Sequence, residues 1–388
     1  MDASVNRIPS SKDERAYLIA LHDKSGIIKA TEYSLNELEL LVKTAGAIVV
    51  DTKIFKRDAI DPTYIIGKGS VESLKKKIQD NGIKLIVFDL NTIRPAQVRN
   101  LEDALTCRVI GRTEVILDIF ARRARSAESK IQVELAQLRY ILPRLKGLGG
   151  VLSRLGGGIG TRGPGEKMLE TDRRHVMRRI STLSKRLKAI KKHRETSRKS
   201  RAREFRGAVV GYTNAGKSSL INKLAKDDLF VENKLFATLD SYTRSVYLGT
   251  GEKVLLSDTV GFIRNIPANL VESFRSTLEE IVHADFLIHV VDLSSDDIET
   301  NILTVQRELM NIECGDKPII LFLNKADLVK EESVIRIENS LYPNSIAGSV
   351  KTGSGLAVLK ERIISQHKEM FVKNSLHNSG HTIHNATM

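Results

Sequence analysis

The sequence predicts an α/β fold in three parts: an N-terminal parallel α/β subdomain, an antiparallel helical hairpin with a glycine-rich loop, and a second α/β domain. Two observations point to this order. Short β-branched runs alternate with helical patterns near both ends of the 388-residue chain, which is typical of βαβ units around a parallel sheet. Between them, two stretches repeat apolar residues in steps of three and four on either side of a glycine-rich segment, which indicates paired helices.

The N-terminal subdomain is expected over residues 1–112. Strands are predicted at 16–22, 47–55, 84–90 and 107–112, where short runs of apolar and β-branched residues occur. Helices are predicted between them at 34–46, 70–82 and 95–105. Ser34 and Ser70 are the expected N-caps of the first two helices, because a hydroxyl can accept a hydrogen bond from the unpaired backbone N–H groups there.

The helical hairpin is expected over residues 113–190. One apolar seam consists of Ile131, Leu135, Leu138, Leu142 and Leu145, and a second consists of Val176, Ile180, Leu183, Leu187 and Ile190. Seams of matched phase and length favour two helices that bury them against each other over separate packing on neighbouring domains. The connecting loop, residues 146–166, has nine glycines among 21 residues, which suits contact with a folded RNA surface better than a plain connector.

Positive charge is concentrated in the middle of the chain. Residues 120–206 contain 25 Lys and Arg against 7 Asp and Glu, an excess larger than the net +14 of the whole protein. Residues 191–206 lack an apolar stripe and are predicted to form a basic linker. A local excess of this size favours a polyanionic partner such as RNA over a merely solvated helical surface.

Composition narrows the class of protein. The 41% hydrophobic and 28% charged residues are typical of a soluble globular chain, and no apolar run approaches the length of a membrane-spanning helix. The polar N-terminus is unlike a signal peptide. Two distant cysteines, Cys107 and Cys314, favour a reducing cytoplasm, with peripheral association at a membrane left open.

The second α/β domain is expected over residues 207–372, followed by a disordered tail at 373–388. A predicted strand at 207–212 leads into a match to the pattern G-x-x-x-x-G-K-[ST], made by Gly211, Tyr212, Thr213, Asn214, Ala215, Gly216, Lys217 and Ser218. In this pattern, glycines let backbone N–H groups face phosphates, the lysine neutralises the β/γ-phosphate charge, and the hydroxyl coordinates Mg²⁺. The motif predicts a nucleoside triphosphate site with Mg²⁺ as its cofactor.

A second motif follows the predicted strand at 253–258 and consists of Asp258, Thr259, Val260 and Gly261. Asp258 would reach Mg²⁺ through a water molecule, and the Gly261 amide would contact the γ-phosphate. A threonine upstream of this motif is expected to complete the Mg²⁺ shell and to sense the γ-phosphate. Thr238 is the preferred candidate and Thr243 is the second.

Phe262 stands where Ras-like enzymes have the glutamine that orients the attacking water. A phenylalanine cannot bond to water, so slow intrinsic hydrolysis and an external activator are expected. Because Phe262 directly follows the glycine, it is expected in a mobile switch rather than in the core.

A third motif ends the predicted apolar strand near residue 323 and consists of Asn324, Lys325, Ala326 and Asp327. A carboxylate at this place can accept both donors on the edge of guanine, whereas adenine would leave it unpaired. Asp327 is therefore expected to select guanine, with Asn324 holding the purine and Lys325 packed on its face. The next segment, Ser349, Val350 and Lys351, is expected to support the base.

These motifs and their order resemble the HflX-type GTPases. The most specific stretches are 130–145, 152–166, 169–174, 211–220, 236–240 and 258–267. The resemblance implies a Ras-like P-loop G domain behind the hairpin, and it adds Phe236, Ala237, Thr238, Leu239 and Asp240 to the nucleotide site. It places Mg²⁺ on Ser218 and Thr238, and catalysis on Lys217, Thr238 and Gly261. The chain departs from the family where Ser241 and Tyr242 follow the 236–240 stretch.

The resemblance also implies function and partners. The protein is expected to hydrolyse GTP, to bind the large ribosomal subunit and its rRNA, and to split or rescue stalled or idle ribosomes. GTP, GDP and rRNA are the expected partners, DNA is not, and the free protein is expected to be monomeric. The alternative is a nucleotide-gated, RNA-binding regulatory switch without ribosome-splitting activity.

Overall fold

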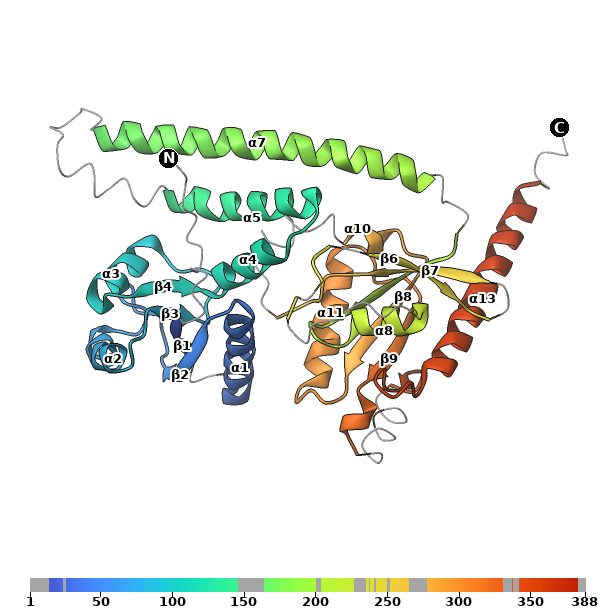
Figure 1. Cartoon of the computed structure of the whole chain (residues 1–388), viewed down its shortest axis with the longest axis horizontal. Coiled ribbons are helices and arrows are strands. Elements are labelled where there is room, and N and C mark those ends of the chain that lie inside the picture. The colour runs from blue at the N-terminus through green and yellow to red at the C-terminus, as the bar shows by residue number, and fades with distance from the viewer. Residues whose placement is uncertain are drawn as a thin grey trace. The chain divides into compact units, whose positions relative to one another are not determined.

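A computed structural model describes the backbone of residues 14–23, 26–145, 164–199, 204–226, 235–236, 238–240, 242–249, 252–264, 278–330, 337 and 342–382 (Figure 1). Side chains are described for all of these except residues 164–170, 194–199 and 371–382. The described residues form two compact units, a first up to residue 196 and a second from residue 197 onward.

The first unit contains a four-stranded parallel sheet with the strand order β2-β1-β3-β4. Its strands are β1 (Arg15–His22), β2 (Ile48–Lys56), β3 (Leu85–Phe88) and β4 (Arg108–Gly111). They coincide with the four strands that the sequence predicts. Every residue of β3 is buried, since helices cover both faces of the sheet (Figure 1).

Four helices pack on this sheet, namely α1 (Ile28–Thr44), α2 (Lys68–Asp80), α3 (Pro95–Leu105) and α4 (Arg112–Arg123). The N-caps predicted at Ser34 and Ser70 are wrong, because both residues lie inside helices that begin earlier. The Ser34 hydroxyl instead donates to Asp89 at 2.5 Å, beyond the end of β3. Gly67, with φ of +80°, provides the turn into α2 that no side chain caps.

The helix α4 begins at the predicted boundary at residue 112 and contacts both the α/β part and α5 (Ala127–Leu145). It contacts α1 and buries Val115, Ile116 and Ile119. Arg112, at its start, is buried and pairs with Glu37 on α1 and with Asp89 at 2.9 Å. The start of α4 is thus held by carboxylates of α1 and of the residue that follows β3.

The helices α5 (Ala127–Leu145) and α7 (Pro164–Lys199) lie side by side and antiparallel (Figure 1). The Arg179 guanidinium joins them by two hydrogen bonds to the Glu134 carboxylate, at 2.6 and 3.0 Å. On α7, the five predicted seam residues are buried or half-buried, as seam packing requires. Most of the glycine-rich loop predicted at 146–166 lies outside the described residues, which resume at Pro164.

The helix α7 continues to Lys199, into the basic linker predicted at 191–206. Residues 191–199 contain neither proline nor glycine, so no local stop signal ends the helix. Helix propagation also costs less than nucleation, which favours extension of an existing helix into a polar segment.

The second unit contains a six-stranded sheet with the order β10-β9-β8-β5-β7-β6. Its parallel strands are β5 (Arg206–Gly211), β7 (Lys253–Asp258), β8 (Phe286–Asp292), β9 (Ile319–Asn324) and β10 (Ile346–Ala347). The edge strand β6 (Thr243–Tyr247) pairs with β7 in the antiparallel sense. The sequence did not predict β6 because only Val246 in it is buried, which leaves no apolar run to recognise.

The helical elements of this unit are α8 (Lys217–Ala225), α10 (Glu279–Val282), α11 (Ile298–Asn311), the 3-10 turn η2 (Ala326–Leu328) and α13 (Leu356–Thr382). Leu220 of α8 and Leu359 of α13 share one buried core cluster, while Ile302 of α11 packs with Val291 and Leu323 in another. Two apolar layers therefore hold the sheet between helices, and the carboxyl ends of its parallel strands stay open to a site.

The C-terminal helix α13 extends to Thr382, into the range 373–388 where the sequence predicts a disordered tail. Residues 373–382 contain no proline, so the helix that starts at Leu356 meets no residue that must end it. Among the helices that the structure describes, none has the length and apolarity that crossing a membrane requires.

A histidine lies in the core of the second unit. His289, in the middle of β8, is 2% exposed. Burial lowers its pKa to about 3, and the positive charge of Lys217 acts in the same direction. In the unfolded chain the same imidazole takes up a proton near pH 6.5.

We expect this difference to make the protein acid-sensitive. Because the pKa is lower in the folded state, stability is fully present above pH 6.5 and is lost as the pH falls towards 3. The loss from this group approaches about 1.4 kcal/mol per pH unit. Urea unfolding followed by circular dichroism between pH 7 and 4 should therefore show a shallower pH dependence for His289→Asn than for the wild type. Parallel pH dependences would contradict this.

Candidate functional site

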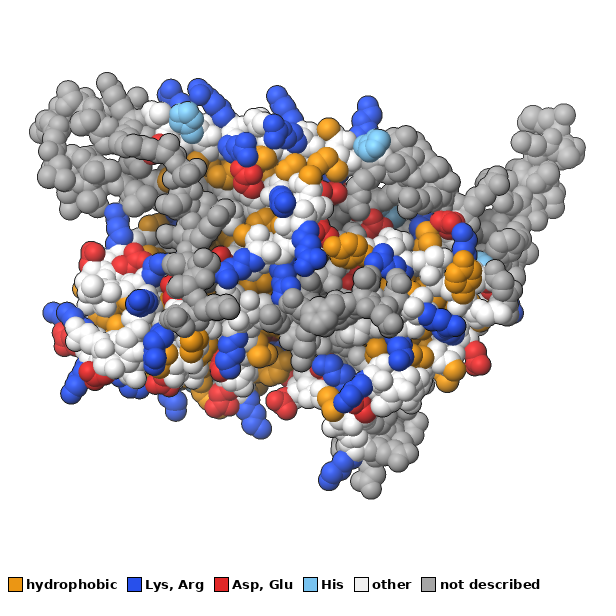
Figure 2. All heavy atoms as spheres, viewed as in Figure 1, with side chains coloured by type: hydrophobic (Ala, Val, Ile, Leu, Met, Phe, Trp, Pro, Cys, Tyr) orange, Lys and Arg blue, Asp and Glu red, His pale blue; other side chains and the backbone are white. Residues whose placement is uncertain are grey.

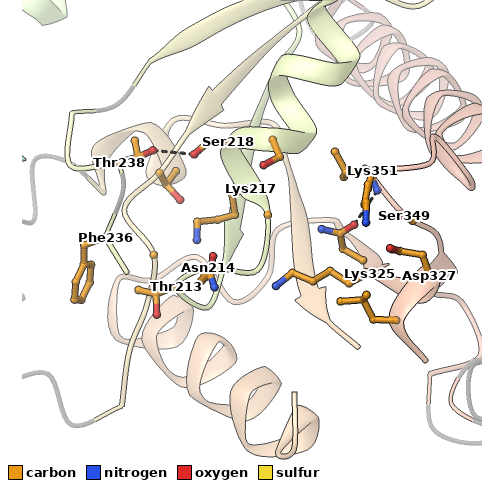
Figure 3. Close-up of a pocket in the computed structure, with 17 residues that line it drawn as sticks. Thr213, Asn214, Lys217, Ser218, Phe236, Thr238, Lys325, Asp327, Ser349 and Lys351 are labelled. Carbon is orange, nitrogen blue, oxygen red and sulfur yellow. Dashed lines mark hydrogen bonds between the residues drawn. The ribbon is translucent and has the colours of Figure 1, made fainter. Parts of the chain in front are cut away.

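A cavity of about 350 Å³ opens in the second unit where β5, β7 and β9 end (Figure 3). It is lined by Thr213, Asn214, Gly216, Lys217, Ser218, Ser219, Phe236, Thr238, Thr259, Gly261, Asn324, Lys325, Asp327, Leu328, Ser349, Val350 and Lys351. Residues from all the predicted motifs meet here. Ser219 and Leu328 are the lining residues that the sequence did not single out. Of the predicted residues described, Gly211, Tyr212, Ala215, Leu239, Asp240, Asp258, Val260 and Ala326 do not line it directly.

The loop between β5 and α8 needs glycine at two places. At Gly211, with φ of +151°, a Cβ would lie 2.3 Å from the Val290 carbonyl oxygen. At Gly216, with φ of +99°, a Cβ would lie 2.3 Å from Nδ2 of Asn324. Both backbones must approach a neighbour too closely for a side chain, so the loop curls tightly before α8 begins at Lys217.

Lys217 is buried and turns back over its own loop. Its ammonium group donates to the carbonyl oxygens of Gly211 at 3.2 Å and Tyr212 at 2.8 Å. Burial lowers its pKa to about 8, against the attraction of Asp258, which raises it. A partly desolvated cation at the mouth of a curled glycine loop is suited to bind a phosphate.

Three side-chain oxygens meet beside this lysine. The Ser218 hydroxyl donates to Asp258 Oδ2 at 2.6 Å, the Thr238 hydroxyl donates to the same oxygen at 2.9 Å, and the two hydroxyls are 2.8 Å apart (Figure 3). Burial raises the pKa of Asp258, and the hydroxyl bonds oppose that rise. Within the described part of the chain, Asp258 Oδ1 is buried without a hydrogen-bond partner. This set of hard oxygen donors with an unsatisfied carboxylate oxygen fits a Mg²⁺ ion.

The structure distinguishes the two candidate threonines. Thr238 lies against Ser218, whereas the Thr243 hydroxyl lies in β6 and bonds to Ser257 Oγ at 2.9 Å. Phe236, with φ of +52°, is buried and lines the cavity. Ala237 lies outside the described residues.

Asn324 joins two loops of the site. Its Nδ2 donates to the Ala215 carbonyl oxygen at 2.8 Å, and its Oδ1 accepts from the Val350 amide at 3.0 Å. Asn324 therefore joins the 211–218 loop to the 349–351 loop. One of the two N–H donors on Nδ2 is used in this way, and the predicted contact of this side chain with the purine stays a prediction.

At the far end of the cavity, Lys325 and Asp327 are both accessible to a ligand. The Lys325 ammonium donates to Asp292 at the end of β8, at 2.5 Å, and its backbone has φ of +64°. Asp327 lies in η2, is exposed and lines the cavity. A carboxylate at this end faces the region where a planar base with paired donors can lie.

The 258–261 segment is held closely against the 211–218 loop. The Thr259 hydroxyl is fully buried and donates to the Val209 carbonyl at 2.7 Å. A Cβ at Gly261 would lie 2.8 Å from Thr213 Cα and 2.9 Å from Lys217 Nζ. Only glycine at position 261 therefore lets this segment pack so closely on the 211–218 loop.

Phe262 is 4% exposed, so the structure places it in the core and not in a mobile switch. Its amide donates to the Gly211 carbonyl at 3.1 Å, and its carbonyl accepts from the Thr213 amide at 2.8 Å. These bonds continue the pairing of β5 with β7 beyond the ends of both strands. Burial of an apolar ring stabilises the folded protein, whereas exposing the ring to solvent in a switch segment would not.

Three family models match successive parts of the chain between residues 32 and 325. They are described as GTP-binding GTPase N-terminal, GTP-binding GTPase middle region and 50S ribosome-binding GTPase, and they match residues 32–121, 123–201 and 206–325. A solved structure titled as the complex of SsGBP with GDP is 26% identical. It covers 92% of this chain and 99% of that chain, with a TM-score of 0.50.

Curated relatives are more similar in sequence. The GTPase HflX of Caldanaerobacter subterraneus subsp. tengcongensis is 48% identical over 82% of this chain and 73% of its own length. The GTPase HflX of Escherichia coli is 40% identical over 86% of this chain and 80% of its own length. Because such identity extends across both units and the site carries the motifs of a P-loop GTPase, the chain belongs to the HflX family of GTPases and binds GTP and GDP through its second unit.

Proposed function

We propose that this GTPase holds GTP in the cavity of the second unit and acts on the large ribosomal subunit. The observation that supports the nucleotide placement best is the group of Ser218, Thr238 and Asp258 oxygens beside the Lys217 ammonium. The triphosphate would lie along the 211–218 loop. Guanine would lie at the opposite end, with its donors on Asp327 and its face on Lys325.

Mg²⁺ would be held by the hydroxyls of Ser218 and Thr238, with Asp258 reaching it through water. When bound, it neutralises charge on the β- and γ-phosphates. Thr238 would also respond to the bound nucleotide. It belongs to a different segment from Ser218 and must approach Ser218 for both hydroxyls to bind the same Mg²⁺ ion.

Two residues of the chain, Lys217 and Gly261, are placed to stabilise negative charge on the phosphates. Lys217 would place an ammonium over the phosphates, and Gly261, packed closely on Thr213 and Lys217, would offer its amide to the γ-phosphate. Phe262 cannot orient a water, and its burial keeps the ring away from the phosphates. Intrinsic hydrolysis is therefore expected to be slow, and the ribosome is expected to supply or order the missing element.

The first unit carries a surface suited to RNA. Over residues 171–193 of α7 there are nine Lys and Arg against one acidic residue, Asp172. The seam residues of α7 are turned inward, and most of these charges are exposed (Figure 2). A long rigid row of cations fits the phosphate backbone of rRNA. Together with the 50S ribosome-binding description of the matching family, this supports a role in splitting or rescuing stalled or idle ribosomes.

Removing charges from α7 should weaken binding to large ribosomal subunits. The test variant replaces four exposed residues of α7 with glutamine: Arg178, Lys185, Arg186 and Lys188. The matched control replaces four exposed lysines of the same unit with glutamine: Lys29, Lys68, Lys75 and Lys76. Each lost phosphate contact should reduce the slope of log affinity against log salt by about 0.7–0.9.

The measurement is co-sedimentation of the full chain with large subunits in a non-hydrolysable GTP analogue at several salt concentrations. The α7 variant should bind at least about tenfold more weakly at moderate salt, and the control should bind like the wild type. Equal affinities of the two variants would contradict an RNA-binding role for α7. Light scattering of intact ribosomes with GTP then shows whether binding leads to splitting.

A further inference from the structure

The segment that follows Gly261 is joined to the nucleotide loop and to a helix outside the cavity. After the two backbone bonds of Phe262, the Arg264 amide donates to the Tyr212 hydroxyl at 2.9 Å. Tyr212 is a residue of the 211–218 loop. Three hydrogen bonds in a row thus connect residues 262–264 with that loop.

The Arg264 side chain points the other way, to the start of α11. Its Nη2 donates to Asp297 Oδ2 at 2.8 Å and to Asn301 Oδ1 at 3.3 Å. The Asp297 carboxylate also caps α11, since its other oxygen accepts from the Thr300 amide at 3.3 Å. Partial burial acts to raise the pKa of Asp297, but the bonds to Thr300 and Arg264 hold this pKa below its ordinary value.

None of the residues that line the cavity comes from α11. The helix is fixed to the sheet by its buried residues Ile302, Val305 and Leu309. A guanidinium bonded to the N-terminus of such a helix therefore ties the segment that follows Gly261 to a helix that is packed on the sheet. The side chain of Arg264 is 13% exposed, so solvent weakens this ion pair less than a surface pair.

Gly261 lies three residues before Arg264 and has little room to move. A displacement of the 262–264 segment would carry Gly261 away from its close packing on Thr213 and Lys217. Charge stabilisation in a transition state depends steeply on position, and a misplacement of about 1 Å costs up to about a hundredfold in rate. The anchoring of residue 264 is thus relevant to a reaction that takes place at residue 261.

We propose that the Arg264–Asp297 pair is a positioning device for GTP hydrolysis, in which α11 holds the Gly261 amide in register with the γ-phosphate. Arg264 itself does not touch the nucleotide. The inference rests on the nucleotide placement proposed above, in which the Gly261 amide contacts the γ-phosphate.

A different role for the same arginine is release from Asp297 to stabilise the γ-phosphate directly. The two roles differ in what the loss of the Asp297 charge should do. If Asp297 holds a positioning arginine, Asp297→Asn lowers the rate. If Asp297 restrains an arginine that has to swing to the phosphate, Asp297→Asn leaves the rate unchanged or raises it. Asparagine remains a good N-cap, so this substitution removes the charge and keeps the start of α11.

The experiment measures single-turnover GTP hydrolysis and GTP affinity for the full chain, with and without large ribosomal subunits. Four variants are compared with the wild type: Arg264→Ala, Arg264→Lys, Asp297→Asn and the double variant Arg264→Ala with Asp297→Asn. Arg307→Ala, which removes an exposed arginine from the same helix, is the matched control.

We expect Arg264→Ala and Asp297→Asn each to lower the maximal rate about tenfold, with GTP and GDP affinities within about twofold of the wild type. The double variant should be no slower than either single variant, because both remove one interaction. Arg264→Lys should recover part of the rate, and Arg307→Ala should keep all of it.

The inference is overturned by a wild-type or faster rate in Asp297→Asn, by additive losses in the double variant, or by a loss confined to nucleotide affinity. Since Asp297→Asn is conservative, it decides the matter even when Arg264→Ala does not fold. A failure of the nucleotide placement is recognised separately, because Lys217→Ala would then hydrolyse GTP normally.

Discussion

Replacing Lys217 with alanine should abolish GTP hydrolysis while the protein stays folded. The ammonium group lies over the 211–218 loop, where burial lowers its pKa to about 8. Removing one preorganised group that stabilises transition-state charge costs roughly 10²–10³ in rate. Loss of the phosphate contact should weaken GTP binding as well.

The fold should tolerate this change because a buried cation is itself costly in the nucleotide-free protein. Circular dichroism and thermal unfolding check that point, and single-turnover hydrolysis with and without large ribosomal subunits measures the effect. Lys223→Ala serves as the matched control, since Lys223 is an exposed lysine on the same helix. A Lys217→Ala protein that turned over GTP at the normal rate on ribosomes would show that the 211–218 loop is not the active loop.

Asp327→Asn should change the nucleotide that the protein prefers. The carboxylate accepts both the N1–H and the N2–H₂ donors of guanine, whereas the asparagine amide presents one acceptor and one donor. Loss of a hydrogen bond to a charged acceptor costs about 1.5–3 kcal/mol, so GTP affinity should fall roughly 10- to 150-fold. Xanthine has a carbonyl in place of the amino group, and xanthosine triphosphate should bind better to the variant than to the wild type.

Competition between GTP and xanthosine triphosphate for the full chain measures this exchange. Asp316→Asn, at an exposed aspartate away from the cavity, controls for the loss of a negative charge. Equal GTP affinity in the wild type and in Asp327→Asn would disprove the role of Asp327. Because Asp327 is exposed at the edge of the cavity, its replacement should not alter stability.

Much of the local structure could be read from the sequence. The four strands of the first sheet and the strands β5, β7 and β9 of the second follow from short apolar runs, and the sequence predicts the helix α3 with the bounds that it has, Pro95–Leu105. The need for glycine at Gly211 and Gly216 follows from the pattern of the loop, and the structure provides the reason in two close backbone approaches. Errors occurred where ends of elements depend on contacts, as for α1, whose Ser34 bonds to a residue 55 positions away.

The sequence by itself determined which residue types gather at the site and in what order along the chain. That information is local, because strand ends, tight loops and helix starts are set by neighbouring residues. The order of the motifs with their strands was therefore enough to predict a nucleotide-binding α/β domain and a basic helical pair.

Only the tertiary structure decided which of these residues touch. Asn324 bonds to a carbonyl 109 positions away, Thr238 and not Thr243 reaches Ser218, Phe262 is buried, and Arg264 is tied to α11. No local pattern specifies such contacts, since a side chain finds its partner only after the sheet has brought distant strand ends to one edge. The physical reason is that packing and hydrogen-bond satisfaction are decided by the whole core, whereas the motifs record only what each segment contributes to it.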